Sequence, residues 1–447
     1  MKMTKYKLGE LVEVTRGASL SGQFYAEEGK LIRLTLGNFN MNGGGFKENT
    51  SKTDLYFTGT VRDEFILNKG DIITPLTEQS LGLLGTTARI PESGKYIQSQ
   101  DVALVRCKEG LLDPNFCYYL ISSSIVRQQL SAAAQQTKIR HTSPEKIKDC
   151  TVWVPDFYTQ KNIGRILTDI DNKIAINRRI NDNLEAMAKQ LYDYWFVQFD
   201  FPNEEGKPYK SSGGAMVWND VVKQFIPESW NVYKVKDLLS VITGKQDANF
   251  ASKQGKYKFF TCSQETLNCD VAEFEGSAIL IAGNGDFNVK HYTGSFNAYQ
   301  RTYVLIPPVK YYAVVFMATS MLLEKFKKNS SGSIIKFITK GDVENITVFD
   351  CGDDTLYNKL NNLFFMIEQN NKEIEKLTKQ RDELLPLLMN GQASVNYHLS
   401  AKAYPLPIAY KKAMPIEANQ IISSTFIQKL DSHIPSPRLQ TSQIHCS

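Results

Sequence analysis

The stretch ILTDIDNKIAINRRINDNLEAMAKQLYDYWF, residues 166–196, determines how the rest of this chain is interpreted. It contains no proline or glycine and its apolar residues recur at helical intervals, so it predicts one long amphipathic helix. The predicted seam repeats every seven residues at Ile163, Ile170, Asn177, Leu184 and Leu191, with a second seam position at Ile166, Ile180 and Met187. Such a seam needs a partner, because otherwise its apolar side chains would face water.

A second predicted helix, from about Asp354 to a stop at Asn390-Gly391, has the same periodicity. Its predicted seam residues are Ile367, Ile374, Leu377, Leu384 and Leu388. The economical arrangement pairs the two helices with each other, and polar seam residues such as Asn177 and Asn370 would then fix their register at some cost in stability. The pattern alone leaves open the alternative that each helix packs only on its own domain.

Short β-type runs, broken by glycine and proline, precede each long helix, and one helix from Pro114 to about Ala134 interrupts the first set. We therefore predict an α+β fold with two β-rich modules and two long helices. The predicted segments are a first module at 1–155, a first helix at 156–198 capped by Asp156, a polar linker at 199–217, a second module at 218–352, a second helix at 353–392 and a poorly ordered extension at 393–447.

The two halves of the chain match each other in several places. YKLGELVEVTRG from Tyr6 matches YKVKDLLSVITG from Tyr233, and DIITPL at Asp71 resembles AILIAG at Ala278. Further along, the matched pairs are Gln100 with Gln300, Ile147 with Val343 and Ile170 with Ile367. The matches keep one order while their separation falls steadily, so the sequence predicts one β-rich module plus one helix, written twice.

Composition excludes several classes of protein. The formal net charge of +5 is too small to indicate nucleic-acid binding by itself. The longest mostly apolar run, Tyr311 to Leu323, is too short to cross a bilayer and no signal peptide is recognisable, so we expect a cytoplasmic protein with no membrane contact. Seven cysteines without a CxxC pair indicate neither a disulfide framework nor a zinc site.

No convincing catalytic motif is present. A GxxxxGK[ST] phosphate loop, a GxSxG elbow and an Asn/Asp-Pro-Pro-aromatic motif are all missing, and the five histidines lack metal-ligand spacing. We therefore predict no catalytic residues, no metal site and no bound cofactor, although a triad assembled from distant residues stays open.

Polar and basic loop residues remain as candidates for recognition. Arg, Lys, Asn and Gln side chains can contact base edges and phosphates, so we predict DNA contacts there. In the first module the candidates are Arg89, Lys95, Lys138, Arg140 and His141. In the second they are Lys245, Gln246, Asn284, Lys290, Tyr292, Gln300, Arg301 and Lys336, in loops that also hold His291 and Asn297. For any single residue a solvated surface is the simpler interpretation, and only the duplication favours recognition.

The central segment LYDYWFVQFDFPNEEGKPYKSSGGAMVWND…IPESWNVYKV, Leu191 to Val235, closely resembles the specificity (S) subunits of type I restriction-modification systems. The resemblance covers about residues 5–400 and includes the end of the second helix, LLPLLMNGQASV, whereas the β-rich modules match the family only in outline. The tail after about Ser400 departs from the family pattern.

This resemblance implies a non-catalytic subunit that reads an asymmetric, bipartite site on double-stranded DNA. It implies two target-recognition domains at opposite ends of an antiparallel coiled coil, related by a pseudo-twofold repeat, and two methyltransferase (M) subunits docked on the assembly. Restriction (R) subunits would join through the M subunits. S-adenosylmethionine, ATP and magnesium would bind to these partners. Two other function classes stay open at this stage, namely a protein-interaction scaffold that does not bind DNA and a two-module enzyme of unrecognised class.

Overall fold

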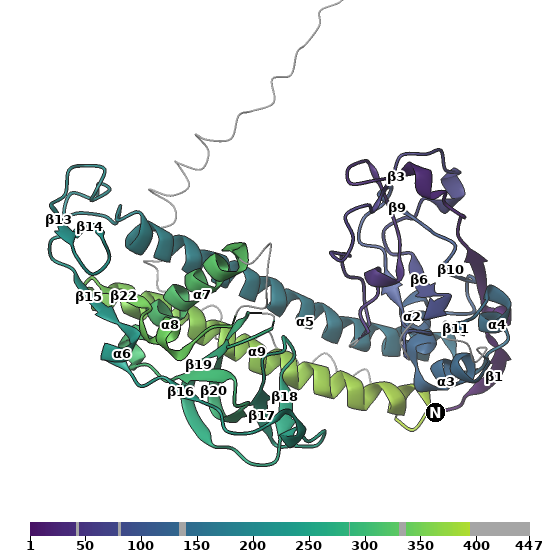
Figure 1. Cartoon of the computed structure of the whole chain (residues 1–447). Helices are drawn as coiled ribbons and strands as arrows, with labels where there is room; N and C mark the ends of the chain where they lie inside the picture. The colour runs from purple at the N-terminus through teal and green to yellow at the C-terminus, as the bar shows by residue number, and fades with distance from the viewer. Residues whose placement is uncertain (42–43, 79–81, 134–139, 286, 330–336, 394–447) are drawn as a thin grey trace, which may run out of the picture. The chain divides into compact units, whose positions relative to one another are not determined.

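The computed structural model describes residues 1–41, 44–78, 82–133, 140–285, 287–329 and 337–393 (Figure 1). Lys138, Lys336 and the predicted extension beyond Ala393 lie outside these residues. Contacts divide the chain into two compact units, unit 1 with Met1–Ile166 and Leu384–Ser447, and unit 2 with Leu167–Glu383. Both long helices, α5 (Phe157–Tyr192) and α9 (Asp354–Met389), contribute to both units. The segment boundaries predicted from the sequence follow repeated modules and stay predictions.

Unit 1 is built around an antiparallel sheet in the order β2-β10-β6-β8. Its strands are β2 (Val12–Arg16), β10 (Val102–Cys107), β6 (Ile72–Pro75) and β8 (Ala88–Arg89). A smaller sheet, in the order β3-β5-β4-β9, joins Tyr25–Ala26, Tyr56–Phe57, Leu31–Arg33 and Tyr96–Ile97. The central strand β10 is buried from Val102 to Val105, because neighbours cover both of its faces.

The remaining elements of unit 1 connect these sheets to α5. The strand β1 (Thr4–Lys7) pairs with β12 (Thr151–Val154), and β7 (Thr77–Glu78) pairs with β11 (Arg140–His141). The short helices are α1 (Leu8–Leu11), α2 (Pro114–Ser122), α3 (Ser124–Ala133) and α4 (Pro144–Lys148). The single helix predicted from Pro114 to about Ala134 is therefore two helices separated at Ser123.

Unit 2 contains a sheet in the order β16-β21-β19-β20-β17-β18. Its strands are β16 (Ile242–Thr243), β21 (Thr302–Leu305), β19 (Phe274–Ala282), β20 (Val289–Ala298), β17 (Tyr257–Phe260) and β18 (Leu267–Cys269). The strand β15 (Asn231–Lys234) pairs with β22 (Thr347–Asp350), and a hairpin joins β13 (Met216–Asn219) to β14 (Gln224–Pro227). Three helices, α6 (Val235–Leu238), α7 (Tyr312–Asn329) and α8 (Lys340–Glu344), complete the unit.

Strand register confirms the internal repeat. Val105 pairs with Ile72 in unit 1, and their counterparts Leu305 and Ile279 pair in unit 2. The same holds for three further pairs of strands. The pair Tyr6–Val152 of unit 1 is equivalent to Tyr233–Val348 of unit 2. The pair Leu104–Thr15 is equivalent to Val304–Ile242. The parallel pair Ile32–Tyr96 is equivalent to Lys258–Phe296. The sequence matches therefore identify residues at equivalent positions, and not merely similar strands.

Within unit 2 the two long helices pack antiparallel (Figure 1). Asn177 of α5 donates to Glu373 of α9 at 2.9 Å, and Asp171, earlier in α5, pairs with Arg381, later in α9, at 3.0 Å. The two helices therefore run in opposite directions. Asn181 accepts a hydrogen bond from Asn370 at 2.9 Å. These bonds satisfy amides that would otherwise be costly to bury.

The predicted first seam position of α5 is buried at Ile163, Ile170, Asn177 and Leu184 and partly buried at Leu191. The predicted second seam position is wrong. The structure buries Leu167, Ile174, Asn181 and Ala188 there, whereas Met187 is 45% exposed and Ile166 and Ile180 are only partly buried. In α9, Ile367, Leu377 and Leu388 are buried and Ile374 and Leu384 are partly buried. The prediction chose apolar residues for this position. The structure instead places Asn181 there, because Asn370 donates a hydrogen bond to its side chain.

Each long helix is fixed to its β module by hydrogen bonds in its first turns. At the start of α5, Asp156 caps the helix by accepting from the Thr159 amide at 3.0 Å, as predicted. Buried Gln160 donates to the Pro155 carbonyl at 2.9 Å and accepts from the Asp113 amide at 3.0 Å. The side-chain amide of Gln160 thereby joins the end of β12, the start of α2 and the first turn of α5.

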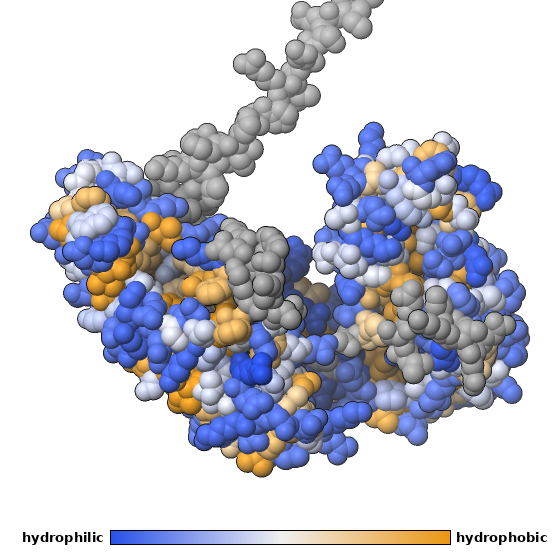
Figure 2. Space-filling model, in the orientation of Figure 1, coloured by the Kyte–Doolittle hydropathy of each residue, from blue (hydrophilic) through white to orange (hydrophobic). Residues whose placement is uncertain are grey.

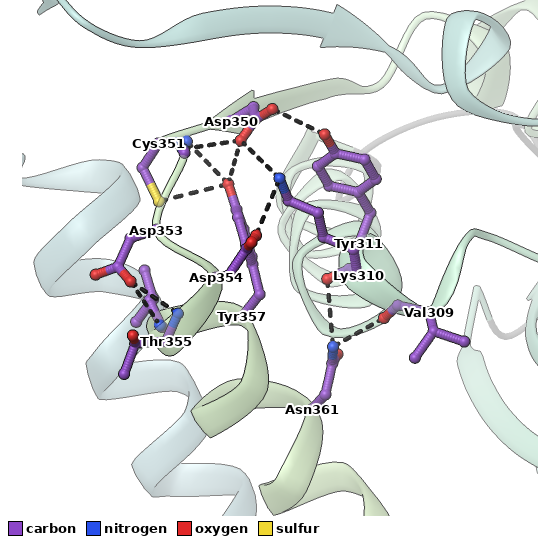
Figure 3. A network of polar contacts seen from close by, with 12 residues as sticks. Val309, Lys310, Tyr311, Asp350, Cys351, Asp353, Asp354, Thr355, Tyr357 and Asn361 are labelled. Carbon is purple, nitrogen blue, oxygen red and sulfur yellow. Dashed lines mark hydrogen bonds and ion pairs between the residues drawn. The ribbon is translucent and has the colours of Figure 1, made fainter.

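The corresponding attachment of α9 is an aspartate–tyrosine network (Figure 3). Buried Asp350, the last residue of β22, accepts from the hydroxyls of Tyr357 at 2.7 Å and Tyr311 at 2.8 Å. Burial favours a higher pKa for this carboxyl group, but the two hydroxyls and the Gly352 amide outweigh it and hold the pKa of Asp350 below its ordinary value. Asn361, one turn after Tyr357, donates to the Val309 carbonyl at 2.8 Å.

The segment that carries the sequence resemblance forms an aromatic stack at the end of α5. Phe201 lies against Trp195, Tyr209 and Trp230 with ring centroids 4.9, 4.6 and 5.2 Å apart. Buried Phe199 has a φ of 60°, which turns the chain out of the helix into this stack. Stacked rings of this size stabilise the junction through buried area, so the predicted linker is held against unit 2.

One close backbone approach recurs in both units, and we call it the glycine crossing. In unit 1 it consists of residues 17–19 against 98–101, and in unit 2 of residues 244–246 against 298–301. A Cβ atom on Gly17 would lie 2.2 Å from the Gln98 carbonyl oxygen, and one on Gly244 would lie 2.0 Å from that of Ala298. Only glycine fits at either position, since a methyl group would collide with backbone atoms.

We expect Gly244→Ala to lower the free energy of unfolding of unit 2 by more than about 2 kcal/mol, because the crossing must open to admit the new methyl group. Urea unfolding would measure the change. Gly341→Ala is the matched control, since the nearest atom to its Cβ would be the Thr339 hydroxyl oxygen at 3.7 Å. Equal midpoints for Gly244→Ala and the parent would show that the crossing is looser than described.

His291 gives unit 2 a dependence on pH. It lies in β20 with its ring edge-on to Phe316 and Phe364, at centroid distances of 5.3 and 5.4 Å, and burial lowers its pKa from 6.5 to about 4. Above pH 6.5 the imidazole is neutral in both the folded and the unfolded state. Below that pH the unfolded chain takes up the proton first, so acidification to pH 4 should remove up to about 3 kcal/mol of stability.

We therefore expect the urea midpoint of His291→Phe to be nearly the same at pH 7 and pH 5. The urea midpoint of the parent should fall more between these two pH values. His141→Gln, at an exposed histidine of unit 1, should leave that drop unchanged. If both variants lose stability on acidification as much as the parent does, His291 is not the titrating group.

Candidate nucleic-acid interface

In unit 2 the structure brings five of the predicted DNA-contact residues to one end of the sheet. Gln246 accepts, through its carbonyl, a hydrogen bond from the Gln300 amide at 2.8 Å. Gly283, next to Asn284, donates its amide to the Arg301 carbonyl at 2.9 Å. Lys245, adjacent to Gly244, is exposed and pairs with Glu273 at 2.6 Å. The glycine crossing of unit 2 and the neighbouring loop at Asn284 thus bring together polar and basic side chains.

Two other predicted residues of unit 2 are engaged in packing. Lys290 donates to the Ser263 carbonyl at 2.5 Å, and burial lowers the pKa of its ammonium group. Tyr292 lies against Phe260 and Phe296, with ring centroids 5.3 and 5.9 Å apart. Two residues from the same loops, His291 and Asn297, lie inside unit 2, and Asn297 is buried and donates to the Val271 carbonyl at 3.1 Å.

In unit 1 the described candidates do not gather at the crossing. Arg140 pairs at 3.1 Å with Glu78, whose other carboxylate oxygen accepts from the Leu83 amide at 2.9 Å and the Leu84 amide at 3.0 Å. Glu78 is 2% exposed, so Arg140 neutralises a buried charge. His141 is exposed beside Arg140 on β11.

The other two described candidates of unit 1 are also paired within the protein. Arg89 donates to Asn115 at 2.9 Å, with its guanidinium over the ring of Tyr118. Lys95 pairs with Glu92 at 3.1 Å, and this hydrogen bond raises the pKa of the lysine. Each could still reach DNA by exchanging partners, so the predicted contacts stay predictions.

The structure adds a pocket in unit 1 that the sequence analysis missed. It has a volume of about 350 Å³ and lies at the glycine crossing. Its lining includes Ala18, Tyr25, Arg33, Thr35, Asn49, Ser51, Lys52, Ser99, Gln100 and Asp101. The match of Gln100 with Gln300 could have indicated this pocket. Gln300 and Arg301 were predicted as DNA contacts in the second module, but their counterparts Gln100 and Asp101 were not predicted in the first.

Unit 2 also exposes apolar side chains. Figure 2 shows apolar residues gathered at the end of the unit that carries the β13–β14 hairpin, where Trp218 and Phe225 are more than half exposed. Ile176 and Met187 on α5 and Met366 on α9 are exposed as well. A contiguous exposed apolar patch, such as the one at the hairpin, marks contact with another protein more often than free solvent exposure.

The residues that the structure describes also bear on metal binding and on membrane insertion. No group of three or more His, Cys, Asp or Glu side chains there is arranged to hold a metal ion. No helix there has both the length and the apolar character needed to cross a membrane.

Relatives share this organisation. The profile of the type I restriction modification DNA specificity domain matches residues 1–186 and 227–348, which cover both β modules and much of α5. The type I restriction enzyme EcoDI specificity subunit of Escherichia coli is 36% identical over 174 residues, 37% of this chain and 39% of that relative's length. The type I restriction enzyme MjaIX specificity subunit of Methanocaldococcus jannaschii is 24% identical over 320 residues, 64% of this chain and 71% of the relative.

A solved structure agrees on the fold. The type I restriction-modification system S subunit from M. genitalium superimposes with a TM-score of 0.54 at 18% identity, over 87% of this chain and 96% of that one. Because the specificity-domain profile occurs twice and covers more than half of the chain, this protein belongs to the family of type I restriction modification DNA specificity domain proteins, the specificity subunits.

Proposed function

We propose that this chain is the DNA sequence-recognition subunit of a type I restriction-modification complex, and that each unit reads one half of a bipartite site on double-stranded DNA. The observation that carries the proposal is the glycine crossing, where an equivalent glycine in each unit allows the same close backbone approach but the neighbouring side chains differ. Unit 1 presents Ala18 and Asp101 where unit 2 presents Lys245 and Arg301.

Different side chains on one frame imply different base preferences. Base edges in the major groove carry distinct patterns of donors and acceptors, which carboxylates, amides and guanidinium groups distinguish. A dimer of identical readers would recognise a palindrome, whereas two unlike readers on one chain would recognise an asymmetric site. The two half-sites should therefore differ in sequence.

The long helices suit a spacer between the two readers. Each has 36 residues, which at about 1.5 Å per residue gives a rod of roughly 50 Å. That length exceeds one turn of duplex DNA, so in this proposal the helices fix the unread gap between the half-sites.

Methyltransferase subunits, two in this proposal, would dock on the helix pair. Lys173, Ile180 and Met187 are seven residues apart on α5, as Met366 and Glu373 are on α9, and a Lys173–Glu373 ion pair joins the helices on this side. The exposed side chains of Met187 and Met366 therefore flank the seam together. The β strands of unit 2 meet α9 elsewhere, through the Lys258–Glu375 pair at 2.9 Å. Methyl transfer with S-adenosylmethionine, and cleavage with ATP and magnesium by restriction subunits, would belong to the partners.

Replacing residues 1–155 with the first module of another specificity subunit should change one half-site and leave the gap and the other half-site intact. The measurement is the methylated motif of cells that carry the chimaera, read by methylome sequencing. Replacing residues 218–352 instead should change only the other half-site. A change in both half-sites from a single exchange would contradict the modular proposal.

Met187→Glu should weaken binding of the methyltransferase subunits at least tenfold, because a carboxylate would enter a dry apolar contact. Affinity capture of the co-expressed subunits would measure the loss. Glu185→Gln, two residues earlier and therefore on the opposite side of α5, should have no effect. Unchanged capture by Met187→Glu would remove the helix flank from the proposed docking surface.

A further inference from the structure

We infer that residues 100 and 101 in unit 1 and residues 300 and 301 in unit 2 are the specificity-determining positions, with one dipeptide reading each half-site. This inference rests on the proposed function and assigns it to Gln100-Asp101 and Gln300-Arg301. The common glutamine reads a base shared by the half-sites, and the aspartate or arginine reads a base in which they differ.

Equivalent register places these dipeptides at the same point of the fold. Val102 and Thr302, which follow them directly, begin β10 and β21. Val102 pairs with Pro75 in unit 1, and at the equivalent positions Thr302 pairs with Ala282 in unit 2. Each dipeptide therefore lies on the glycine crossing, where the backbone is fixed by neighbours on both sides.

The two glutamine side chains have free donors and acceptors, unlike the described basic candidates of unit 1. Gln100 and Gln300 are exposed, and within the described residues neither side-chain amide forms a hydrogen bond. By contrast, Arg89, Lys95 and Arg140 already have protein partners. A side chain whose bonds are unused gains more from a base edge than one that must first give up a partner.

In unit 1 the pocket supplies a rigid wall beside the dipeptide. Arg33 is only 7% exposed, stacks 3.8 Å from the ring centroid of Tyr25 and donates to the Asp54 carboxylate at 3.2 Å. Asn49 donates to Thr35 at 2.8 Å and is held at its other end by the Ser51 amide at 2.9 Å. The side chains of Arg33 and Asn49 already form hydrogen bonds within the protein, so they shape the pocket wall. Gln100 and Asp101 are the residues of the dipeptide that line the pocket and could contact a base.

The side chains specify which bases to expect. A glutamine amide can bond to adenine N6 and N7 together, a carboxylate accepts from cytosine N4, and an arginine bonds to guanine O6 and N7 together. We therefore expect an adenine in both half-sites, next to a cytosine in the half-site of unit 1 and a guanine in that of unit 2. Lys52 on the pocket rim is placed to offset repulsion between Asp101 and the phosphates.

The test is binding selection from a duplex DNA library with randomised positions, at fixed salt, using the full chain co-purified with its methyltransferase subunits. Asp101→Arg should change the base preference of one half-site, and Arg301→Asp that of the other. Gln100→Ala and Gln300→Ala should each lower discrimination at one position by about tenfold. Asp101→Asn serves as a milder second variant in case the arginine disturbs folding, and Glu109→Gln, exposed on a loop of unit 1, is the control.

The outcomes separate the two levels of the argument. If the parent complex selects no sequence, the proposed function fails. Circular dichroism and retained binding of the methyltransferase subunits would show that the variants are folded. If the parent selects a bipartite site and these folded variants select the same bases as the parent, this inference fails while the proposed function stands. A change confined to one half-site for each dipeptide supports it.

Discussion

The attachment of each long helix to its β module is the constraint on which the rest of the structure depends. Asp350 shows why the attachment is specific, because a buried carboxylate is costly unless donors surround it, and Tyr311, Tyr357 and the Gly352 amide supply them. These donors come from the loop after β22, the turn before α7 and the first turns of α9. The carboxylate is satisfied only when all three segments meet, so it fixes the direction in which α9 leaves β22.

The two units solve this attachment with different side chains at equivalent positions. Gln160 in unit 1 corresponds to Tyr357 in unit 2, and each is buried and bonded to the end of the preceding strand or loop. One turn later, Gly164 corresponds to Asn361. A Cβ on Gly164 would lie 2.6 Å from the Phe116 amide nitrogen, so glycine lets α5 approach α2, whereas Asn361 accepts from the Ala313 amide and caps α7. Similar junctions therefore rest on close contact in one unit and hydrogen bonding in the other.

Periodicity and duplication predicted the fold from the sequence because both depend on many residues at once. The match at Tyr6 and Tyr233 corresponds to one strand register, and the match at Gln100 and Gln300 precedes strands that pair in the same register from Val102 and Thr302. Single positions were less predictable. Asn181 lies in the helix seam only because Asn370 is opposite it, and the sequence does not display that pair. Likewise Arg140 looked free in its loop, but its partner Glu78 comes from a distant strand.

This division between buried frame and exposed position explains how such a protein could change what it recognises while keeping its fold. The glycine crossing is held by backbone bonds and by Gly17 and Gly244, whose replacement would force the strands apart. The adjacent residues 100, 300 and 301 are exposed, and substitutions at such positions usually change stability by less than about 0.5 kcal/mol. A change of one side chain there could alter a base contact by about 1–3 kcal/mol, several times its effect on folding. Under the proposed function, recognition could therefore vary on this frame without a matching loss of stability.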